Sequence, residues 1–247
     1  MTDKCRLDAL LVDRGLVESR AKAQALVIAG RVYSGERRLE KPGQATPVDI
    51  PLIVRQADHD WVSRGGLKLA HGLSYFSVDA TGRDCLDIGA STGGFTDVLL
   101  KAGARTVHAV DVGRGQLDWS LRNDDRVTVL EGVNARYLTA ADITKPPSLI
   151  VCDASFIGLQ IVLPASLALA LPGGFLIALI KPQFEVGKGR VGKGGVVRDP
   201  ALHQEVCDRI RTWLADDQGW IVEGITESPV KGPKGNTEFL IAARKPI

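Results

Sequence analysis

Two charged side chains stand where apolar stretches of the sequence end. "FLIALIK", residues 175–181, ends in Lys181 before a proline, and "SLIVCDA", residues 148–154, carries Asp153 near its end. An ammonium beside a carboxylate suits the deprotonation of an alcohol, because a nearby cation favours the alkoxide and a lysine shielded from water loses its proton more readily. The alternative interpretation of Lys181 is a strand-end lysine that simply reaches solvent.

A glycine-rich loop, "DIGASTGGFTD", spans residues 87–97 between an apolar run and a predicted helix. Phe95 occupies the position where a P-loop requires lysine, which argues against ATP or GTP. The loop also lacks the middle glycine of a dinucleotide site, and Asp87 would repel a pyrophosphate. A carboxylate here suits a cationic ligand. S-adenosyl-L-methionine carries an ammonium and a sulfonium and no phosphate, so we predict it as the cofactor.

Asp111 ends the next predicted strand, where a carboxylate can accept hydrogen bonds from both ribose hydroxyls of an adenosine. This position does not distinguish NAD from S-adenosylmethionine, and Asp87 and Asp111 can also be interpreted as structural or solvated carboxylates. The predicted cofactor contacts are Asp87, Gly89, Ala90, Ser91, Thr92, Gly93, Gly94, Phe95, Asp111, Val112 and Asp153.

The order of elements from about residue 80 predicts an α/β fold. Apolar strand-like runs alternate with helices such as 92–102 and 200–216, which is typical of a doubly wound, mainly parallel sheet with ligands at the carboxyl ends of its strands. The closely spaced last two runs predict one antiparallel strand. The seven predicted strands are 84–90, 106–113, 127–132, 148–154, 173–181, 219–229 and 237–244.

Residues 1–58 form a different, small α+β module in this interpretation, and 59–79 link it to the α/β domain. Helices are predicted at 6–14 and 20–29, each closed by a glycine, followed by short extended pieces. Cations gather in the helix pair and the following hairpin. Acidic residues lie among them, so charge alone also fits an ordinary solvated surface, and the net charge of +2 indicates no bulk attraction to nucleic acid.

Several classes of protein are disfavoured by composition. The four cysteines are isolated and no Cys/His cluster exists, so we predict no metal site and no disulfide framework. No signal-peptide-like segment and no run of ~20 apolar residues is present, so we expect a cytoplasmic protein without a membrane span.

The stretch "RLDALLVDRGLVESRAKAQALVIAGRVYSG", residues 6–35, resembles the small RNA-binding domain first seen in ribosomal protein S-four. The matching features include the helix start at Ser19 and Arg20 and the glycines at 30 and 35. In that family a helix pair and the turn after it lie against folded RNA. The resemblance therefore implies that this module binds RNA.

Residues 60–245 resemble the FtsJ-type ribose 2′-O-methyltransferases, whose hallmark is a Lys-Asp-Lys-Glu tetrad. The matching residues are Lys68 in "SRGGLKL", Asp153 in "CDASF", Lys181 in "LIKPQFE" and Glu238 in "GNTEFLI". The whole chain is similar to the TlyA group, whose members also carry the name hemolysin A. This resemblance implies a Rossmann-like class I methyltransferase domain, which we place at 80–247, acting on a ribose 2′-hydroxyl of ribosomal RNA at cytidine.

The resemblance also implies residue roles. Lys181 would activate the hydroxyl, Asp153 and Glu238 would position it, Lys68 would hold the ribose or a neighbouring phosphate, and Asn134 would lie near the adenine. Ribosomal RNA or a ribosomal subunit is the expected partner, without membrane or metal. The residues expected to contact RNA are Arg14, Arg20, Lys22, Arg31, Arg64, Lys188, Arg190 and Lys193.

Three other functions remain open at this point. A membrane-lytic hemolysin should contain a strongly amphipathic helix or alternating barrel strands, and the sequence indicates neither. A non-catalytic ribosome-assembly factor would have no need of the complete tetrad and glycine loop. A base or a small molecule could also be the acceptor, although Asp153 lacks the proline pair of the NPPY motif found in enzymes that methylate exocyclic amines.

Overall fold

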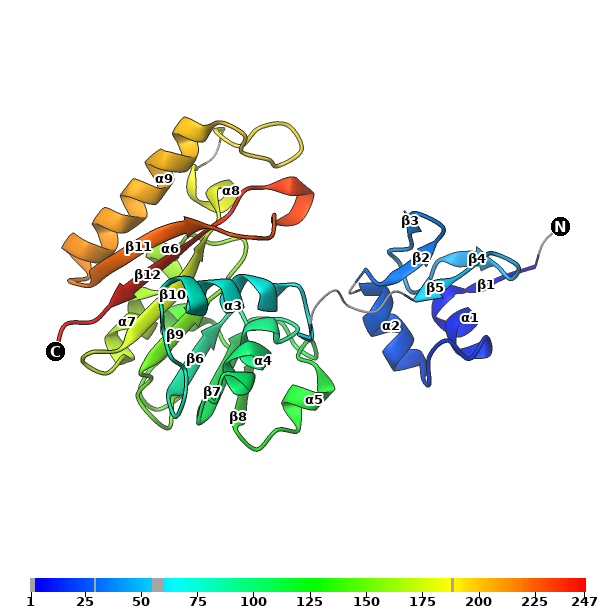
Figure 1. The fold of residues 1–247 in the computed structure, drawn as a ribbon, viewed down its shortest axis with the longest axis horizontal. Helices are drawn as coiled ribbons and strands as arrows, with labels where there is room; N and C mark the ends of the chain where they lie inside the picture. The colour runs from blue at the N-terminus through cyan, green and yellow to red at the C-terminus, as the bar shows by residue number, and fades with distance from the viewer. Residues whose placement is uncertain (1–2, 29, 55–59, 188) are drawn as a thin grey trace. The chain divides into compact units, whose positions relative to one another are not determined.

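The computed structural model describes residues 3–28, 30–54, 60–187 and 189–247 (Figure 1). The chain divides into two compact units, Met1–Asp60 and Trp61–Ile247. The second unit begins earlier than residue 80, where we expected the α/β domain to start, because helix α3 (Gly65–Tyr75) packs on strands β10 and β12 of the sheet. Lys68 therefore projects from a helix of the α/β unit rather than from a linker.

The first unit pairs two short helices with short strands. Its core consists of small and aliphatic side chains on the helix pair and on the strand that follows, among them Leu7, Leu11, Ala23, Val27 and Val32. The hydroxyl of Ser19 accepts a hydrogen bond from the amide of Lys22, which caps the second helix as its sequence predicts. The elements are β1 (Lys4–Arg6), α1 (Leu7–Asp13), α2 (Arg20–Ile28), β2 (Val32–Ser34), β3 (Arg37–Arg38), β4 (Ala45–Pro47) and β5 (Ile53–Val54).

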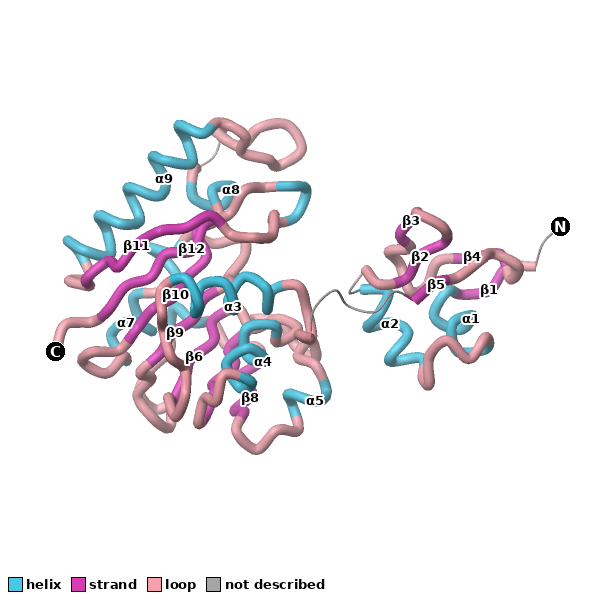
Figure 2. Tube along the Cα trace, viewed as in Figure 1, coloured by secondary structure: helices cyan, strands magenta, loops and turns pink. Residues whose placement is uncertain are grey.

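The second unit is built on a seven-stranded sheet with the strand order β11-β12-β10-β9-β6-β7-β8 (Figure 2). Strand β12 runs antiparallel to both of its neighbours, and the pairs from β10 to β8 are parallel, which confirms the predicted fold class. The strands are β6 (Asp84–Ile88), β7 (Thr106–Asp111), β8 (Val127–Glu131), β9 (Leu149–Cys152), β10 (Phe175–Ile180), β11 (Ile221–Glu227) and β12 (Phe239–Arg244).

Both faces of this sheet are covered, because strands β9 and β10 at its centre are apolar at every position. Along β10, Leu176, Ala178 and Ile180 enter one core, while Ile177 and Leu179 enter the other. Helices α3, α4 (Gly94–Lys101) and α5 (Trp119–Arg122) cover the second of these cores, as Figure 1 shows. The opposite core is covered by α6 (Leu159–Val162), α7 (Pro164–Leu169) and α9 (Pro200–Thr212), and α8 (Pro182–Glu185) packs against α9.

Three short helical turns complete the unit, namely η1 (Ala135–Tyr137), η2 (Trp213–Asp217) and η3 (Pro233–Gly235). The predicted helix 200–216 ends its regular α-helical part at Thr212 and continues as the π-helical turn η2. Strands β6, β9 and β10 lie side by side and point the same way, so the loops that follow them meet at one edge of the sheet. The functional side chains gather at this edge.

Candidate active site

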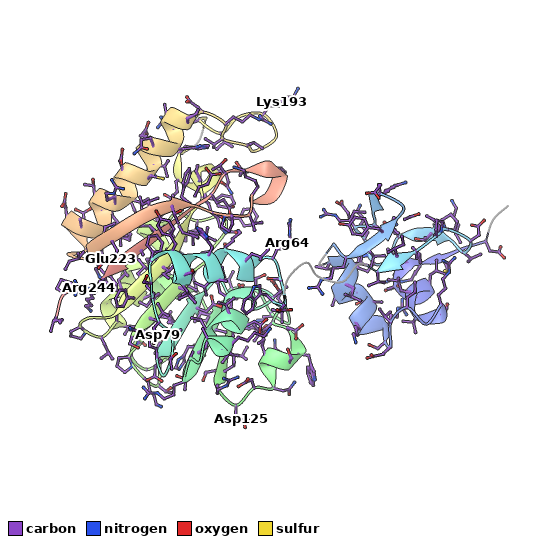
Figure 3. The ribbon with its side chains drawn as sticks, viewed as in Figure 1. Arg64, Asp79, Asp125, Lys193, Glu223 and Arg244 are labelled. Atoms are coloured by element: carbon purple, nitrogen blue, oxygen red, sulfur yellow. The ribbon has the colours of Figure 1, made fainter. Side chains whose placement is uncertain are left out.

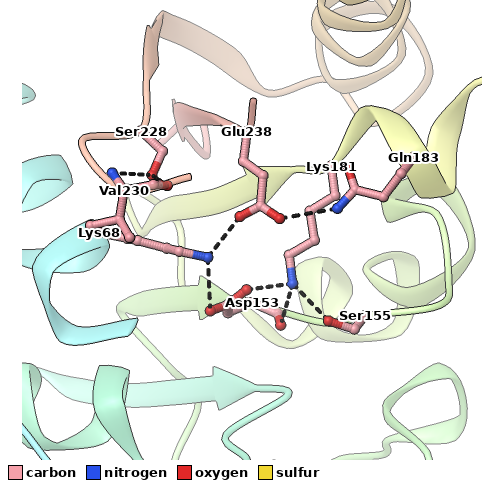
Figure 4. Close-up of polar contacts among 8 residues, drawn as sticks. All are labelled: Lys68, Asp153, Ser155, Lys181, Gln183, Ser228, Val230 and Glu238. Atoms are coloured by element: carbon pink, nitrogen blue, oxygen red, sulfur yellow. Dashed lines mark hydrogen bonds and ion pairs between the residues drawn. The ribbon is translucent and has the colours of Figure 1, made fainter. Parts of the chain in front are cut away.

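Lys181 and Asp153 meet because they follow neighbouring parallel strands. Strand β9 pairs with β10 in a register that sets Cys152 opposite Ala178, and each charged residue comes directly after its strand. The Lys181 ammonium lies 2.5 Å from Oδ1 of Asp153 as an ion pair. It also donates hydrogen bonds to the Asp153 carbonyl at 3.0 Å and to the Ser155 hydroxyl at 2.9 Å (Figure 4).

A second ion pair lies beside the first. Lys68 Nζ, which projects from α3, donates to Oε2 of Glu238 at 2.7 Å and lies 3.8 Å from Oδ2 of Asp153. The other carboxylate oxygen of Glu238 accepts a hydrogen bond from the Gln183 amide at 3.1 Å. Figure 4 shows the four charged groups converging from four separate segments of the chain. The structure thus brings together all four residues that we expected to form the tetrad.

Burial makes these contacts interdependent. Only 8% of Lys68, 6% of Lys181 and 1% of Glu238 is exposed, and the two ammonium groups balance the two carboxylates. A partly desolvated charge that loses its partner carries a large penalty, whereas a balanced set is tolerated. Each charge in this cluster therefore depends on the others, and the side chains are held in one arrangement before any ligand arrives.

Lys68, Asp153, Ser155 and Lys181 line a cavity of about 250 Å³. Its walls come from the loop before α3, the glycine loop and the turn before β12. The other lining residues are Ser63, Arg64, Gly65, Gly89, Ala90, Ser91, Thr92, Gly94, Phe95, Val230, Lys231 and Gly232. We call this the acceptor cavity, because the two lysines that could act on a hydroxyl face it.

A larger cavity of about 660 Å³ lies next to it and shares Gly89, Ser91, Asp153 and Ser155 with the acceptor cavity. Its volume falls in the ~300–1,000 Å³ range of small-molecule sites. The predicted cofactor residues Asp111, Val112 and Asn134 line it, together with residues that we had not predicted. These further residues are Ile88, Val110, Gly113, Gln116, Val133, Ala135, Arg136, Ala154, Phe156, Ile157 and Val162.

The larger cavity fits an adenosine-containing cofactor such as S-adenosylmethionine. Asp111 accepts hydrogen bonds from the amides of Ser91 and Gly113 at 2.8 and 2.7 Å, and each of its oxygens keeps a lone pair for a ribose hydroxyl. Val112 and Phe156 are 69% and 90% exposed, so they offer apolar surface beside this carboxylate for a purine ring. Asn134 Oδ1 accepts a hydrogen bond from the Arg136 amide, which leaves its amide nitrogen for a ring acceptor.

Comparisons with known proteins agree with this geometry. Residues 61–245 match the family model for FtsJ-like methyltransferases, and residues 5–45 match that for the S4 domain. The chain belongs to the FtsJ-like methyltransferase family. This match confirms the family that the tetrad predicted.

The methyltransferase is similar over nearly its whole length to proteins that are named either rRNA methyltransferase or hemolysin. It is 48% identical over 245 residues to the 16S/23S rRNA (cytidine-2′-O)-methyltransferase TlyA of Mycobacterium tuberculosis, covering 99% of this chain and 91% of that one. It is 40% identical over 242 residues to hemolysin A of Brachyspira hyodysenteriae, covering 95% and 98%. A solved structure described as a hemolysin from Streptococcus thermophilus aligns with a TM-score of 0.77 and 42% identity, covering 100% of this chain and 90% of that chain.

Gly89 permits the close approach of two segments under the glycine loop. It has φ +79°, and a Cβ atom there would lie 2.8 Å from the Ala154 Cα and 2.9 Å from its nitrogen. The segment after β9, which carries Asp153 and Ser155, can therefore touch the glycine loop only if residue 89 is glycine. Gly93, which we predicted as a cofactor contact, lines neither cavity; a Cβ at this position would collide with Leu121 at 2.2 Å.

Asp87, which we expected to face the cationic cofactor, lies beneath the loop instead. Its side chain is fully buried and lines neither cavity, and one carboxylate oxygen accepts a hydrogen bond from the Thr96 hydroxyl at 2.6 Å. Burial, with a smaller contribution from the charges of Asp153 and Asp111, raises the pKa of Asp87 to about 7. This residue therefore supports the loop from below, where a neutral form is favoured.

We expect the substitution Asp87→Asn to change how stability depends on pH. Asp87 is protonated in the folded methyltransferase up to a pH of about 7 but ionised in the unfolded chain above its ordinary pKa of 3.8. Between these values the folded state binds more protons, so the wild type loses stability as pH rises, by up to a few kcal/mol at ~1.4 kcal/mol per pKa unit. The Asp87→Asn variant should not lose stability in this way as pH rises. Urea unfolding between pH 4 and 8 measures the difference, and parallel curves for both proteins would contradict the assignment.

The residues expected to contact RNA differ in their surroundings. Arg64 lines the acceptor cavity, and Lys193 lies exposed on the loop before α9; both extend from the surface in Figure 3. Others already have protein partners: Arg14 donates to the carbonyls of Ile50 and Val48, Arg20 pairs with Asp8, Lys22 with Glu18, and Arg190 with Glu205. Arg31 is partly exposed, and Lys188 lies outside the described residues.

Sequence reasoning missed two residues that contact the tetrad directly. Ser155 binds Lys181, and Gln183 binds Glu238. Both lie two positions after a tetrad residue, in "CDASF" and "LIKPQFE". Their proximity to strand ends was the available signal, because residues that follow neighbouring parallel strands gather at the same edge of the sheet.

Proposed function

We propose that this methyltransferase transfers the methyl group of S-adenosylmethionine to a ribose 2′-hydroxyl of ribosomal RNA, at cytidine. The observation that carries the proposal is the meeting of two cavities at Asp153 and Ser155, with the Lys181 amine at the junction. When bound, S-adenosylmethionine supplies an electrophilic methyl group on a sulfonium. The chain supplies a group able to take a proton from an alcohol, which is what a ribose acceptor requires.

Each tetrad residue has a distinct task in this proposal. Lys181 takes the proton of the 2′-hydroxyl, because its amine lies where the two cavities meet. Asp153 holds this amine through its carboxylate and its carbonyl. Lys68, paired with Glu238, faces the acceptor cavity and holds the ribose or a neighbouring phosphate. Since the reacting atoms must be aligned, this fixed arrangement contributes through orientation as well as proton transfer.

RNA is the acceptor that the surroundings favour. The S4 domain match at residues 5–45 and the relatives named as rRNA methyltransferases support this substrate. Arg64 lines the acceptor cavity, and Lys193 and Lys234 lie exposed on loops of the same unit. All three are cations without a protein partner among the described residues and can bind phosphates. This substrate would place the enzyme in the compartment that holds ribosomes, the cytoplasm.

The deciding experiment is methyl transfer from methyl-labelled S-adenosylmethionine to purified 30S subunits, 50S subunits and free ribosomal RNA. We expect label in at least one of these substrates, recovered as 2′-O-methylcytidine after digestion to nucleosides. Label on a base, or none with any of the three substrates, would contradict the proposal. The matched control is a substrate that already carries a 2′-O-methyl group at the mapped position and should accept no label.

The name hemolysin among the relatives makes membrane lysis the second candidate. In the parts of the chain that the structure describes, no helix is long and apolar enough to cross a membrane. The same described residues contain no cluster of three or more His, Cys, Asp or Glu side chains that could hold a metal ion. Dye release from loaded liposomes tests lysis. Release at equal rates by the wild type and by a Lys181→Ala variant, together with no methylation of RNA, would favour the lytic function.

A further inference from the structure

Ser155 places a hydroxyl against the Lys181 amine at the junction of the two cavities. Its Oγ atom lies 2.9 Å from Nζ of Lys181, and Ser155 lines both the larger cavity and the acceptor cavity. The residue is exposed, in contrast to Lys181. A side chain in this position contributes little to the core, so its contact with the amine calls for a separate explanation.

The Lys181 amine has three acceptors around it. Two of them accept hydrogen bonds, namely the carbonyl of Asp153 at 3.0 Å and the hydroxyl of Ser155 at 2.9 Å. The third, Oδ1 of Asp153, forms an ion pair with the amine at 2.5 Å. An ammonium has three N–H bonds and can satisfy all three acceptors. A neutral amine has two N–H bonds and one lone pair. Both Asp153 oxygens repel a lone pair, so the two N–H bonds face Asp153 and the contact with Ser155 must reverse its direction when the proton leaves.

Only the serine can make this reversal. The Asp153 carboxylate and carbonyl are acceptors in this state and have no proton to donate, whereas a hydroxyl both donates and accepts. We propose that Ser155 is a positioning residue that holds the Lys181 amine in both of its protonation states. It accepts a hydrogen bond from the ammonium, and it donates one to the lone pair of the neutral amine.

This inference rests on the proposed function, since it assumes that Lys181 takes a proton from an acceptor hydroxyl. In the neutral state the Ser155 hydroxyl aims the lone pair toward the junction of the two cavities. An arriving ribose hydroxyl then replaces the Ser155 hydroxyl as the hydrogen-bond donor to the lone pair of Lys181. Without Ser155, the two remaining contacts with Asp153 allow the amine to rotate, and fewer encounters have the lone pair directed at the acceptor.

The test compares Ser155→Ala with Ser155→Thr in the full chain. Alanine removes the hydroxyl, and threonine keeps it; Ser155 is exposed and its φ is not positive, so either side chain fits. We expect kcat for RNA methylation to fall about tenfold in Ser155→Ala, the upper end of the range for loss of one hydrogen bond between neutral groups. Ser155→Thr should recover most of this loss. KM for RNA, the Kd for S-adenosylmethionine measured by calorimetry, and Tm should stay at their wild-type values.

The outcomes separate this inference from the proposed function. If the wild type transfers no methyl group to RNA, the proposed function fails and this inference fails with it. If the wild type is active and Ser155→Ala matches its kcat, only the positioning role fails. A loss in Ser155→Ala that appears in the Kd for the cofactor or in KM for RNA would make Ser155 a binding residue. A kcat loss that threonine does not restore would also contradict the role of the hydroxyl.

Discussion

Replacement of Lys181 by alanine should reduce RNA methylation by ~10²–10⁴-fold, the range for loss of a general base. The substitution removes the only amine that touches both Asp153 and Ser155 among the described residues. Because Lys181 does not line the larger cavity, the Kd for S-adenosylmethionine should change little. Single-turnover transfer of labelled methyl groups to RNA and calorimetric titration of the cofactor measure these two quantities separately.

Lys181→Arg is the matched control, because it keeps a positive charge beside Asp153. A guanidinium stays protonated at the pH of the assay and cannot take a proton from a hydroxyl. If Lys181 is the base, arginine should be nearly as inactive as alanine. An active arginine variant would show that a fixed positive charge is sufficient. A large loss of cofactor affinity in Lys181→Ala would show instead that this lysine belongs to the cofactor site.

The positions of Asp153 and Lys181 could be predicted from the sequence pattern for a physical reason. Asp153 and Lys181 directly follow short apolar runs, and such runs are strands of a parallel sheet whose carboxyl ends share one edge. The structure adds that β9 and β10 are neighbours, which sets the carboxylate and the amine 2.5 Å apart. Strand order is a long-range property and cannot be read from any one segment. Lys68 and Glu238 were found only through family resemblance, because neither directly follows a strand.

Burial was the property least accessible from sequence. Asp87 stands at the start of the glycine loop and was a reasonable candidate for contact with a cation, yet its side chain points under the loop to Thr96. Likewise, Arg14 and Arg20 look like free cations in a basic helix pair. Their guanidinium groups bind the carbonyls of Ile50 and Val48 and the carboxylate of Asp8. Such contacts join residues distant in sequence, so charge counts cannot reveal them.

Breaking the Lys68–Glu238 ion pair should cause the largest loss in the free energy of unfolding. The Lys68→Met substitution leaves the buried Glu238 carboxylate with the Gln183 amide, at 3.1 Å, as its only side-chain hydrogen-bond donor among the described residues. Loss of one partner from a buried pair costs ~3–5 kcal/mol. The double variant Lys68→Met/Glu238→Gln removes both charges, so most of this loss should be recovered. Its methyl transfer should remain far below wild type, because nothing then holds the ribose or phosphate.

Tryptophan fluorescence during urea unfolding isolates this effect. All four tryptophans, Trp61, Trp119, Trp213 and Trp220, lie in the second unit, so their signal reports on the methyltransferase unit alone. The paired comparison separates two uses of the same residues. If the double variant is as unstable as Lys68→Met, the pair does not depend on charge balance. If it recovers methylation together with stability, Lys68 supports the fold and has no direct contact with the acceptor.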